Sequence, residues 1–185
     1  VLDGERVLAP MRELGDPVAD LMGPLPYVAM QGLLDALYPA GGSNYFKAGF
    51  IDELSDAAID TLVERHGAMN SPMSEIHVQH FGGAVRRVSP SATAFANRGA
   101  EYVLNVLGRT PDSAGFDEAV DWARVTYDAM EPYTASGTYS NFMSAGDDRV
   151  NQAYPEDTYR RLQALKDRYD PTNLFRLNQN VAPSG

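Results

Sequence analysis

Three consecutive carboxamide side chains near the C-terminus, Asn178, Gln179 and Asn180, are well suited to hold a polar ligand. Each carboxamide carries N–H donors and a carbonyl acceptor, so it can bond the edge of a heterocycle or the rim of a ligand pocket. Phe175 and Leu177 precede them and would serve as apolar anchors. This order predicts a segment that is held still while it presents polar groups. The alternative interpretation is an exposed polar tail.

Tyr139 and Asn141 are a second candidate pair, two positions apart in an expected strand over 138–143. Side chains at this spacing share one face of a strand, so the phenol and the carboxamide would point to the same side. They are candidates to contact a substrate or cofactor. The alternative is an ordinary pair of polar residues on a sheet surface.

The first expected strand, 44–51, alternates in character and contributes two further candidates, Tyr45 and Lys47. Its apolar positions are expected to be buried against helices: Phe46, Ala48 and Phe50. Because successive strand residues point to opposite faces, Tyr45 and Lys47 would then face a wet cleft on the other side of the sheet. For each of them, a purely structural role is the alternative to catalysis.

Other motifs do not indicate a metal or a phosphate site. His77 and His80 lie three apart on an expected strand, where they would point to opposite faces and could not share a metal ion. Gly82-Gly83 is followed by neither a G-x-G-x-x-G pattern nor a Lys-Ser/Thr pair, so it is no phosphate loop.

Composition narrows the function classes further. The chain has 185 residues, no cysteine and a formal net charge of −10, so disulfides and thiolate metal sites are excluded. An acidic protein lacks the Lys/Arg surplus that nucleic acids and anionic membrane surfaces require, so neither is an expected partner. We find no apolar run long enough to cross a bilayer and no signal peptide. Cytoplasmic and secreted locations both stay open.

The periodicity predicts an α+β fold in which strands and helices interleave. Expected strands cover 44–51, 75–81, 84–88, 102–107 and 138–143. Expected helices cover 3–14, a segment after Pro26, a segment from the cap Ser55 to His66, a segment from the cap Ser113 to Met130, and 146–169 with a break near Pro155. Several strands are joined by turns too short for parallel crossovers, which favours an antiparallel sheet with helices packed on one face.

The run R-Y-D-P-T-N-L-F-R-L-N-Q-N at 168–180 closely resembles the C-terminal signature of berberine-bridge-enzyme-like FAD-linked oxidoreductases, within the vanillyl-alcohol-oxidase superfamily. Further blocks resemble the bacterial branch of that family: 5–11, 44–54, 80–98, 102–107 and the Y-S-N-F motif at 139–142. The resemblance implies a partial substrate-binding domain over 1–145 and a C-terminal segment over 146–185 that returns to an FAD-binding domain, itself absent from this sequence.

The resemblance also implies roles for particular residues. Asn141, Asn178 and Asn180 are expected to contact FAD. The candidates for proton transfer are the side chains left on the expected cleft side, Tyr139, Tyr45 and Lys47. Many relatives read Tyr-x-Asn-Tyr here, with the second tyrosine as the base, but this chain has Phe142. Plant relatives can use an acid from the segment that corresponds to Ser91–Thr93, which holds no carboxylate here.

The expected activity is hydride transfer from a small organic substrate, such as an alcohol, a sugar or a natural product, to flavin N5, with O2 as acceptor. FAD would be bound mainly by the missing domain, so the fragment alone would be inactive and would not retain it. A stand-alone α+β domain that binds a ligand or dimerises, without redox activity, is the alternative. A flavin domain encoded upstream of Val1 would distinguish the two.

Overall fold

The computed structural model describes residues 2–144 and 149–185, which form two units. The first ends at Ala40 and the second runs from Gly41 to Gly185. No helix among the described residues is long and apolar enough to span a membrane.

The first unit contains short helices and connecting loops. Its elements are α1 (Leu2–Arg12), α2 (Tyr27–Gln31) and the 3-10 helix η1 (Asp35–Leu37). Arg12 joins the end of α1 to the following loop, because its guanidinium lies 2.6 Å from both Glu5 Oε2 and Asp20 Oδ2. The predicted helix over 3–14 is confirmed to within two residues at its C-terminal end. The helix predicted after Pro26 is only a short turn of α-helix followed by η1.

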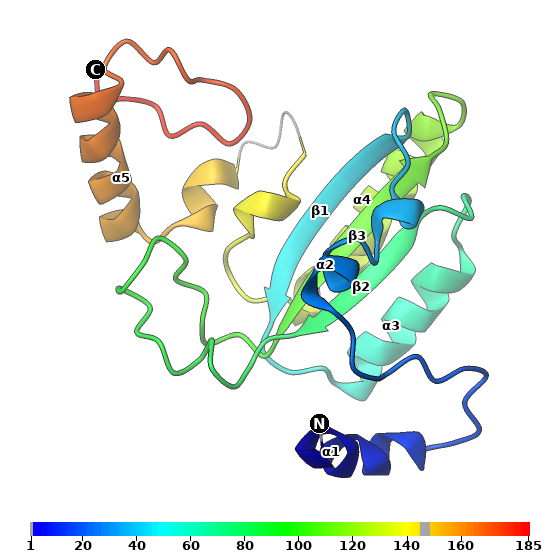
Figure 1. Cartoon of the computed structure of the whole chain (residues 1–185). Coiled ribbons are helices and arrows are strands. Elements are labelled where there is room, and N and C mark those ends of the chain that lie inside the picture. The colour runs from blue at the N-terminus through cyan, green and yellow to red at the C-terminus, as the bar shows by residue number, and fades with distance from the viewer. Residues whose placement is uncertain (1, 145–148) are drawn as a thin grey trace. The chain divides into compact units, whose positions relative to one another are not determined.

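The second unit is built on a three-stranded antiparallel sheet (Figure 1). Its strands are β1 (Ser43–Ile51), β2 (Glu75–His80) and β3 (Tyr102–Thr110), in the order β1-β3-β2. The central strand β3 is buried from Val103 to Thr110. The predicted α+β fold, with an antiparallel sheet and helices packed against it, is confirmed.

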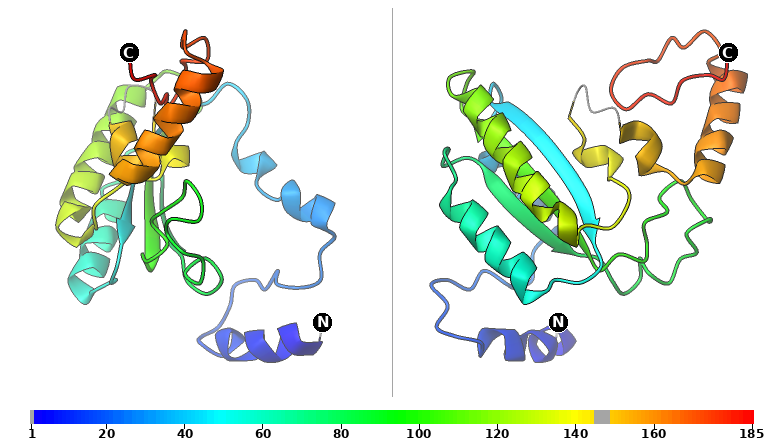
Figure 2. Two further views of the ribbon diagram at one scale, coloured as in Figure 1. Left: turned by 90° about the vertical axis from the view of Figure 1, so that its left-hand side faces the viewer. Right: turned by 180° about the vertical axis from the view of Figure 1, so that it is seen from behind.

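Two helices, α3 (Asp56–Gly67) and α4 (Phe116–Met130), cover one face of the sheet, as Figure 2 shows from two further directions. The predicted cap of α3 is confirmed: Ser55 Oγ accepts a hydrogen bond from the backbone N–H of Ala58 at 3.3 Å. The predicted cap of α4 is wrong. Gly115, with φ of 68°, precedes the helix, because the chain enters α4 through a left-handed turn that glycine adopts without strain.

The apolar core lies between this sheet face and the two helices. Its buried residues are Ile51, Ala58, Leu104, Val106, Trp122, Ala123, Tyr127 and Met130. Trp122 also donates its indole N–H to the carbonyl of Arg65 at 3.0 Å, which joins α4 to α3. Gly108 allows the close approach of α4 to β3, since a Cβ there would lie 2.3 Å from the carbonyl oxygen of Ala119.

The orientation predicted for β1 is wrong, although its alternation is correct. Tyr45 and Ile51 pack against the helix-side core, so Lys47 faces the helices too. Phe50, 1% exposed, instead belongs to a cluster on the opposite face with Val103 and Ala100. The periodicity of a strand shows which residues share a face, but it does not show which of two apolar faces the helices cover.

The outer edge of β1 is covered by the segment 135–144, mostly through side chains. The N–H of Ala135 bonds the carbonyl of Phe50 at 2.7 Å, and Thr138 Oγ1 donates to the carbonyl of Ala48 at 3.1 Å. Ser144 Oγ accepts from the N–H of Phe46 at 2.6 Å. These bonds replace the ladder that a neighbouring strand would make and protect an otherwise open edge.

The strand predicted over 138–143 is therefore wrong, and 140–142 form the 3-10 helix η3 (Ser140–Phe142). The extension predicted over 84–88 is also wrong, because those residues form successive turns.

Beyond η2 (Glu131–Tyr133), the chain continues into η4 (Arg149–Ala153) and α5 (Glu156–Tyr169). Helix was predicted over 146–169, of which 146–148 lie outside the described residues. The predicted break near Pro155 is confirmed.

Candidate functional site

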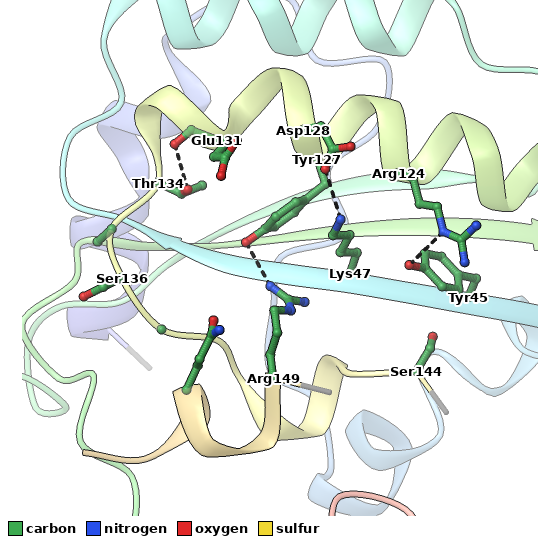
Figure 3. A pocket seen from close by; sticks show the side chains of 13 residues that line it. Tyr45, Lys47, Arg124, Tyr127, Asp128, Glu131, Thr134, Ser136, Ser144 and Arg149 are labelled. Atoms are coloured by element: carbon green, nitrogen blue, oxygen red, sulfur yellow. Dashed lines mark hydrogen bonds and ion pairs between the residues drawn. The ribbon is translucent and has the colours of Figure 1, made fainter. Parts of the chain in front are cut away.

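A polar cavity of about 610 Å³ lies on the helix side of β1, and it contains two of the sequence candidates, Tyr45 and Lys47 (Figure 3). Strand β1, helix α4, the turn at 134–137 and η4 form its walls. The lining residues are Tyr45, Lys47, Arg124, Tyr127, Asp128, Glu131, Thr134, Ala135, Ser136, Gly137, Ser144, Arg149 and Gln152.

Both candidates already have partners in the cavity. The ammonium nitrogen of Lys47 lies 3.0 Å from Asp128 Oδ1 and 4.7 Å from the centre of the Tyr127 ring. Tyr45 accepts a weak hydrogen bond of 3.5 Å from Arg124 Nε. This contact is the largest of the causes that raise the pKa of Arg124 above its ordinary value. Lys47 is thus paired with a carboxylate, which is a poor arrangement for a general base.

Tyr139 and Asn141 lie on the other side of the sheet, although no strand carries them. Asn141 Nδ2 donates to the Tyr139 hydroxyl at 2.9 Å, so the two side chains do lie together. The Tyr139 ring contacts Phe95 and Phe142 edge-on, with centroid distances of 5.6 and 5.1 Å. These aromatics pack against Phe50, on the face opposite the helices. The structure therefore does not bring Tyr139 together with Tyr45 and Lys47.

A row of polar residues on that same opposite face was missed by sequence reasoning. Its members are Asn44 of β1, Asn105 and Arg109 of β3, and Glu75 and His77 of β2. Arg109, whose side chain is 3% exposed, forms an ion pair with Glu75 and donates from Nε to Asn44 Oδ1 at 3.0 Å. Glu75 Oε2 lies 2.5 Å from His77 Nε2.

Asn105 is the most unusual member of the row. It is 2% exposed, and its side-chain oxygen has no hydrogen-bond partner in the described parts of the chain. A buried polar atom without a partner costs about 1–3 kcal/mol, so such groups are uncommon without a role. The available sequence signal was an asparagine in the middle of the apolar run V-L-N-V-L at 103–107.

The C-terminal tail turns sharply after α5, around the carboxylate of Asp170. That carboxylate accepts from the N–H groups of Leu174 at 2.7 Å and Phe175 at 3.1 Å, and it pairs with Lys166. These contacts, the Lys166 hydrogen bond first, lower the pKa of Asp170 below its ordinary value. Lys166 also donates to the carbonyl of Phe175 at 2.6 Å, which ties the segment after the proline to α5.

The carboxamides beyond this turn differ in their environments. Gln179 Nε2 donates to the carbonyl of Met143 at 2.7 Å and anchors the tail, a role the sequence analysis did not assign. Asn178 is exposed and has a left-handed φ of 59°, while Asn180 is partly buried. Phe175 and Leu177, the predicted anchors, are 78% and 84% exposed, so nothing within the described residues covers them.

The described residues contain no cluster of three or more His, Cys, Asp or Glu that could hold a metal ion. His77 and His80 do point to opposite faces of β2. The histidine on the helix side, His80, is 67% exposed and contacts the ring of Tyr102 at a centroid distance of 5.4 Å.

The chain is similar to known proteins in both sequence and fold. Residues 132–182 match the family described as "Berberine and berberine like". The chain is 29% identical over 182 residues to an FAD-linked oxidoreductase of Dictyostelium discoideum, covering 97% of this chain and 40% of that protein. It is 27% identical over 158 residues to the aclacinomycin-N/aclacinomycin-A oxidase of Streptomyces galilaeus, covering 75% of this chain and 29% of the oxidase.

The crystal structure of 6-hydroxy-D-nicotine oxidase from Arthrobacter nicotinovorans shares the fold, with a TM-score of 0.75 and 21% identity, over 98% of this chain and 42% of that protein. These similarities place the chain among FAD-linked oxidoreductases. Within that class, it is similar to berberine-bridge-enzyme-like proteins and corresponds to their substrate-domain and C-terminal part. It spans about 40% of the length of the curated relatives from Dictyostelium discoideum and Bacillus subtilis.

Proposed function

We propose that this chain supplies the substrate-binding wall and the C-terminal flavin contact of an FAD-dependent oxidase. The complete enzyme would transfer a hydride from a small organic substrate to flavin N5 and pass the electrons to O2. FAD would supply the redox chemistry, while residues of this chain would orient the substrate and accept its proton. Similarity to the family supports the class of reaction, and the matched residues 132–182 include both the Y-S-N-F motif and the tail.

The observation that carries this proposal is the arrangement of the tail. Its backbone is fixed by Asp170 and Gln179, yet Phe175, Leu177 and Asn178 project without cover from the described residues. Exposed apolar side chains on a rigid segment are typical of an interface, and here the natural partner is the flavin domain. We infer that Phe175 and Leu177 enter an apolar groove of that domain.

The residues of the tail fit a flavin in their chemistry. Asn178 and Asn180 would offer carboxamide donors and acceptors to the polar edge of the ring or to the ribityl chain. Asn141 would do the same from the opposite face of the sheet, beside Tyr139. We propose that this face, rather than the cavity beside α4, looks toward the cofactor, because the motif residues Tyr139 and Asn141 lie there.

A complete enzyme would test the role of the tail through Asn180→Ala, with Asn151→Ala as the control. Asn151 is an exposed residue of η4. If the Asn180 contact contributes about 1.4–2.8 kcal/mol, its loss should weaken flavin retention or slow flavin reduction about tenfold to a hundredfold. Equal and negligible effects of the two substitutions would leave 178–180 as a solvated tail.

The non-catalytic alternative, an α+β ligand-binding domain, is favoured by one observation, the polar cavity beside α4. The two functions separate in an absorption spectrum of the polypeptide as its gene encodes it. Flavin bands support the oxidase. A colourless protein that binds no added FAD would support the ligand-binding domain.

A further inference from the structure

Oxidation of an alcohol or amine carbon releases a proton in addition to the hydride, so the proposed function needs a proton acceptor near the substrate. The usual tyrosine of the Y-x-N-Y motif is replaced by Phe142, and the Tyr139 hydroxyl already accepts from Asn141. Tyr45 and Lys47 lie on the other side of the sheet. Within this chain, the other residues of the cofactor-facing side are then the candidates to accept the proton.

The polar row on that side contains a histidine that is oriented like a general base. His77 Nε2 lies 2.5 Å from Glu75 Oε2, so the carboxylate accepts the N–H of this nitrogen. Nδ1 is then left with its lone pair free to accept a proton, and in the described chain no residue bonds it. A carboxylate that fixes one imidazole nitrogen, and so exposes the other as acceptor, is a recurrent arrangement in general-base catalysis.

The carboxylate that orients His77 is itself held in place. The second oxygen of Glu75 pairs with Arg109, whose side chain is almost fully buried and is positioned in turn by Asn44. Asn44, Arg109, Glu75 and His77 thus form one chain of contacts across all three strands. This rigidity distinguishes the pair from an exposed surface ion pair, which changes geometry easily.

The position of the pair relative to the family motif follows from the strand register. His77 is the cross-strand partner of Asn105 on β3. Two residues before Asn105, and therefore on the same face, Val103 packs into the aromatic cluster that includes Tyr139. Asn105, between His77 and Val103 in this arrangement of contacts, is buried, and its side-chain oxygen has no partner among the described residues.

We propose that His77 is the proton acceptor of the oxidation and that Glu75 positions it. This inference rests on the proposed function. The substrate C–H bond breaks, and its hydrogen leaves with both electrons to FAD. The neighbouring O–H or N–H bond breaks as its proton moves to His77 Nδ1, and its electron pair forms the new C=O or C=N bond. Glu75 stabilises the resulting imidazolium.

The test uses the complete flavoprotein and anaerobic flavin reduction by three probes: D-glucose, benzyl alcohol and benzylamine. With any probe that reduces the wild-type flavin, His77→Gln should slow reduction about a hundredfold to a thousandfold, with flavin content and probe affinity unchanged. Glu75→Gln should slow it less. In His77→Ala, added imidazole should restore part of the rate, which a merely structural role would not predict.

His80→Gln is the matched control, because His80 lies on the same strand, faces the other side and also has a carboxylate neighbour, Glu101, at 3.7 Å. It should leave the rate unchanged. A His77→Gln enzyme as fast as the wild type, or a His77→Ala enzyme that imidazole does not rescue, would overturn the assignment. If the complete gene product binds no flavin, the proposed oxidase function fails instead.

A second readout needs no flavin and uses the chain of 185 residues. The short bond between His77 Nε2 and Glu75 should give a downfield imidazole N–H proton resonance that exchanges slowly with water. We expect this resonance to be lost in both His77→Gln and Glu75→Gln and kept in His80→Gln. Its absence from the wild-type chain would contradict the geometry on which the assignment depends.

Discussion

The two faces of the sheet differ in what their side chains contribute. The face under α3 and α4 holds the main apolar core, in which Leu104, Val106 and Met130 are fully buried, and the polar cavity lies beside this core along β1. The opposite face combines an aromatic cluster with a row of polar groups that includes the unsatisfied oxygen of Asn105. Burial on the first face stabilises the fold, whereas the second retains groups that cost stability. Such a cost is expected where residues are retained for binding or catalysis.

Truncating the helix-side core should have the largest effect on stability. Leu104→Ala removes a fully buried side chain from the central strand, so we expect the free energy of unfolding to fall by about 2–5 kcal/mol. Urea unfolding of the chain followed by circular dichroism measures it. The control Val63→Ala changes a side chain that is 67% exposed and should cost less than about 1 kcal/mol. Similar losses from both would contradict the location of the core.

A substitution on the opposite face of the sheet should instead increase the stability of the chain. Asn105→Leu replaces an unpartnered buried oxygen by an apolar group of similar size, and we expect the free energy of unfolding to rise by about 1 kcal/mol. The same urea experiment measures the change. A loss of about 1 kcal/mol or more would show that the Asn105 amide is structurally satisfied, and that the face does not retain polarity at the expense of stability.

The hydrogen bonds that cover the edge of β1 should contribute a smaller amount to the free energy of unfolding. Thr138→Val keeps the shape of the buried side chain but removes its hydrogen bond to the carbonyl of Ala48, which should cost about 1 kcal/mol. Thr172→Val, at an exposed position, serves as the control. If Thr138→Val is as stable as the wild type, side chains do not protect this edge.

The smallest effect on global stability is expected at Asp170, because it orders only the tail. Its pKa lies below the ordinary value, so its contribution is complete above the ordinary Asp range and is lost as the pH falls through the lowered pKa. The protection of the N–H groups of Leu174 and Phe175 against hydrogen exchange, measured relative to the intrinsic rate at each pH, should therefore fall in acid. Asp170→Asn should show faster exchange at neutral pH as well. Unchanged protection in this variant would exclude Asp170 as the organising group.

Much of the fold could be predicted from local patterns. The strand 44–51 and the cap at Ser55 depend on alternation and on capping chemistry, which are properties of neighbouring residues. The predictions that were wrong concern features that depend on tertiary contacts. The edge segment 138–143 has the composition of a strand, but Thr138 and Ser144 satisfy the edge of β1 with side chains, so no ladder forms.

The candidate site shows the same limit. The resemblance located Tyr139, Asn141 and the carboxamides of the tail, whose roles stay predictions. Tyr45 and Lys47 were assigned to the cleft side because the apolar alternate residues of β1 were expected under the helices. The pair of Glu75 and His77 was missed because its significance depends on Arg109, which is 34 residues away and meets Glu75 only across the sheet.

The central claim is that this chain is the substrate-side and C-terminal part of a flavoprotein oxidase, and flavin content tests it most directly. The absorption spectrum should be recorded after gel filtration for the polypeptide as its gene encodes it and for residues 1–185 alone. We predict flavin bands in the first and none in the second, because we propose that the phosphate and adenine contacts lie outside this chain. Stoichiometric flavin in residues 1–185 alone, or none in the gene product after incubation with FAD, would contradict the account.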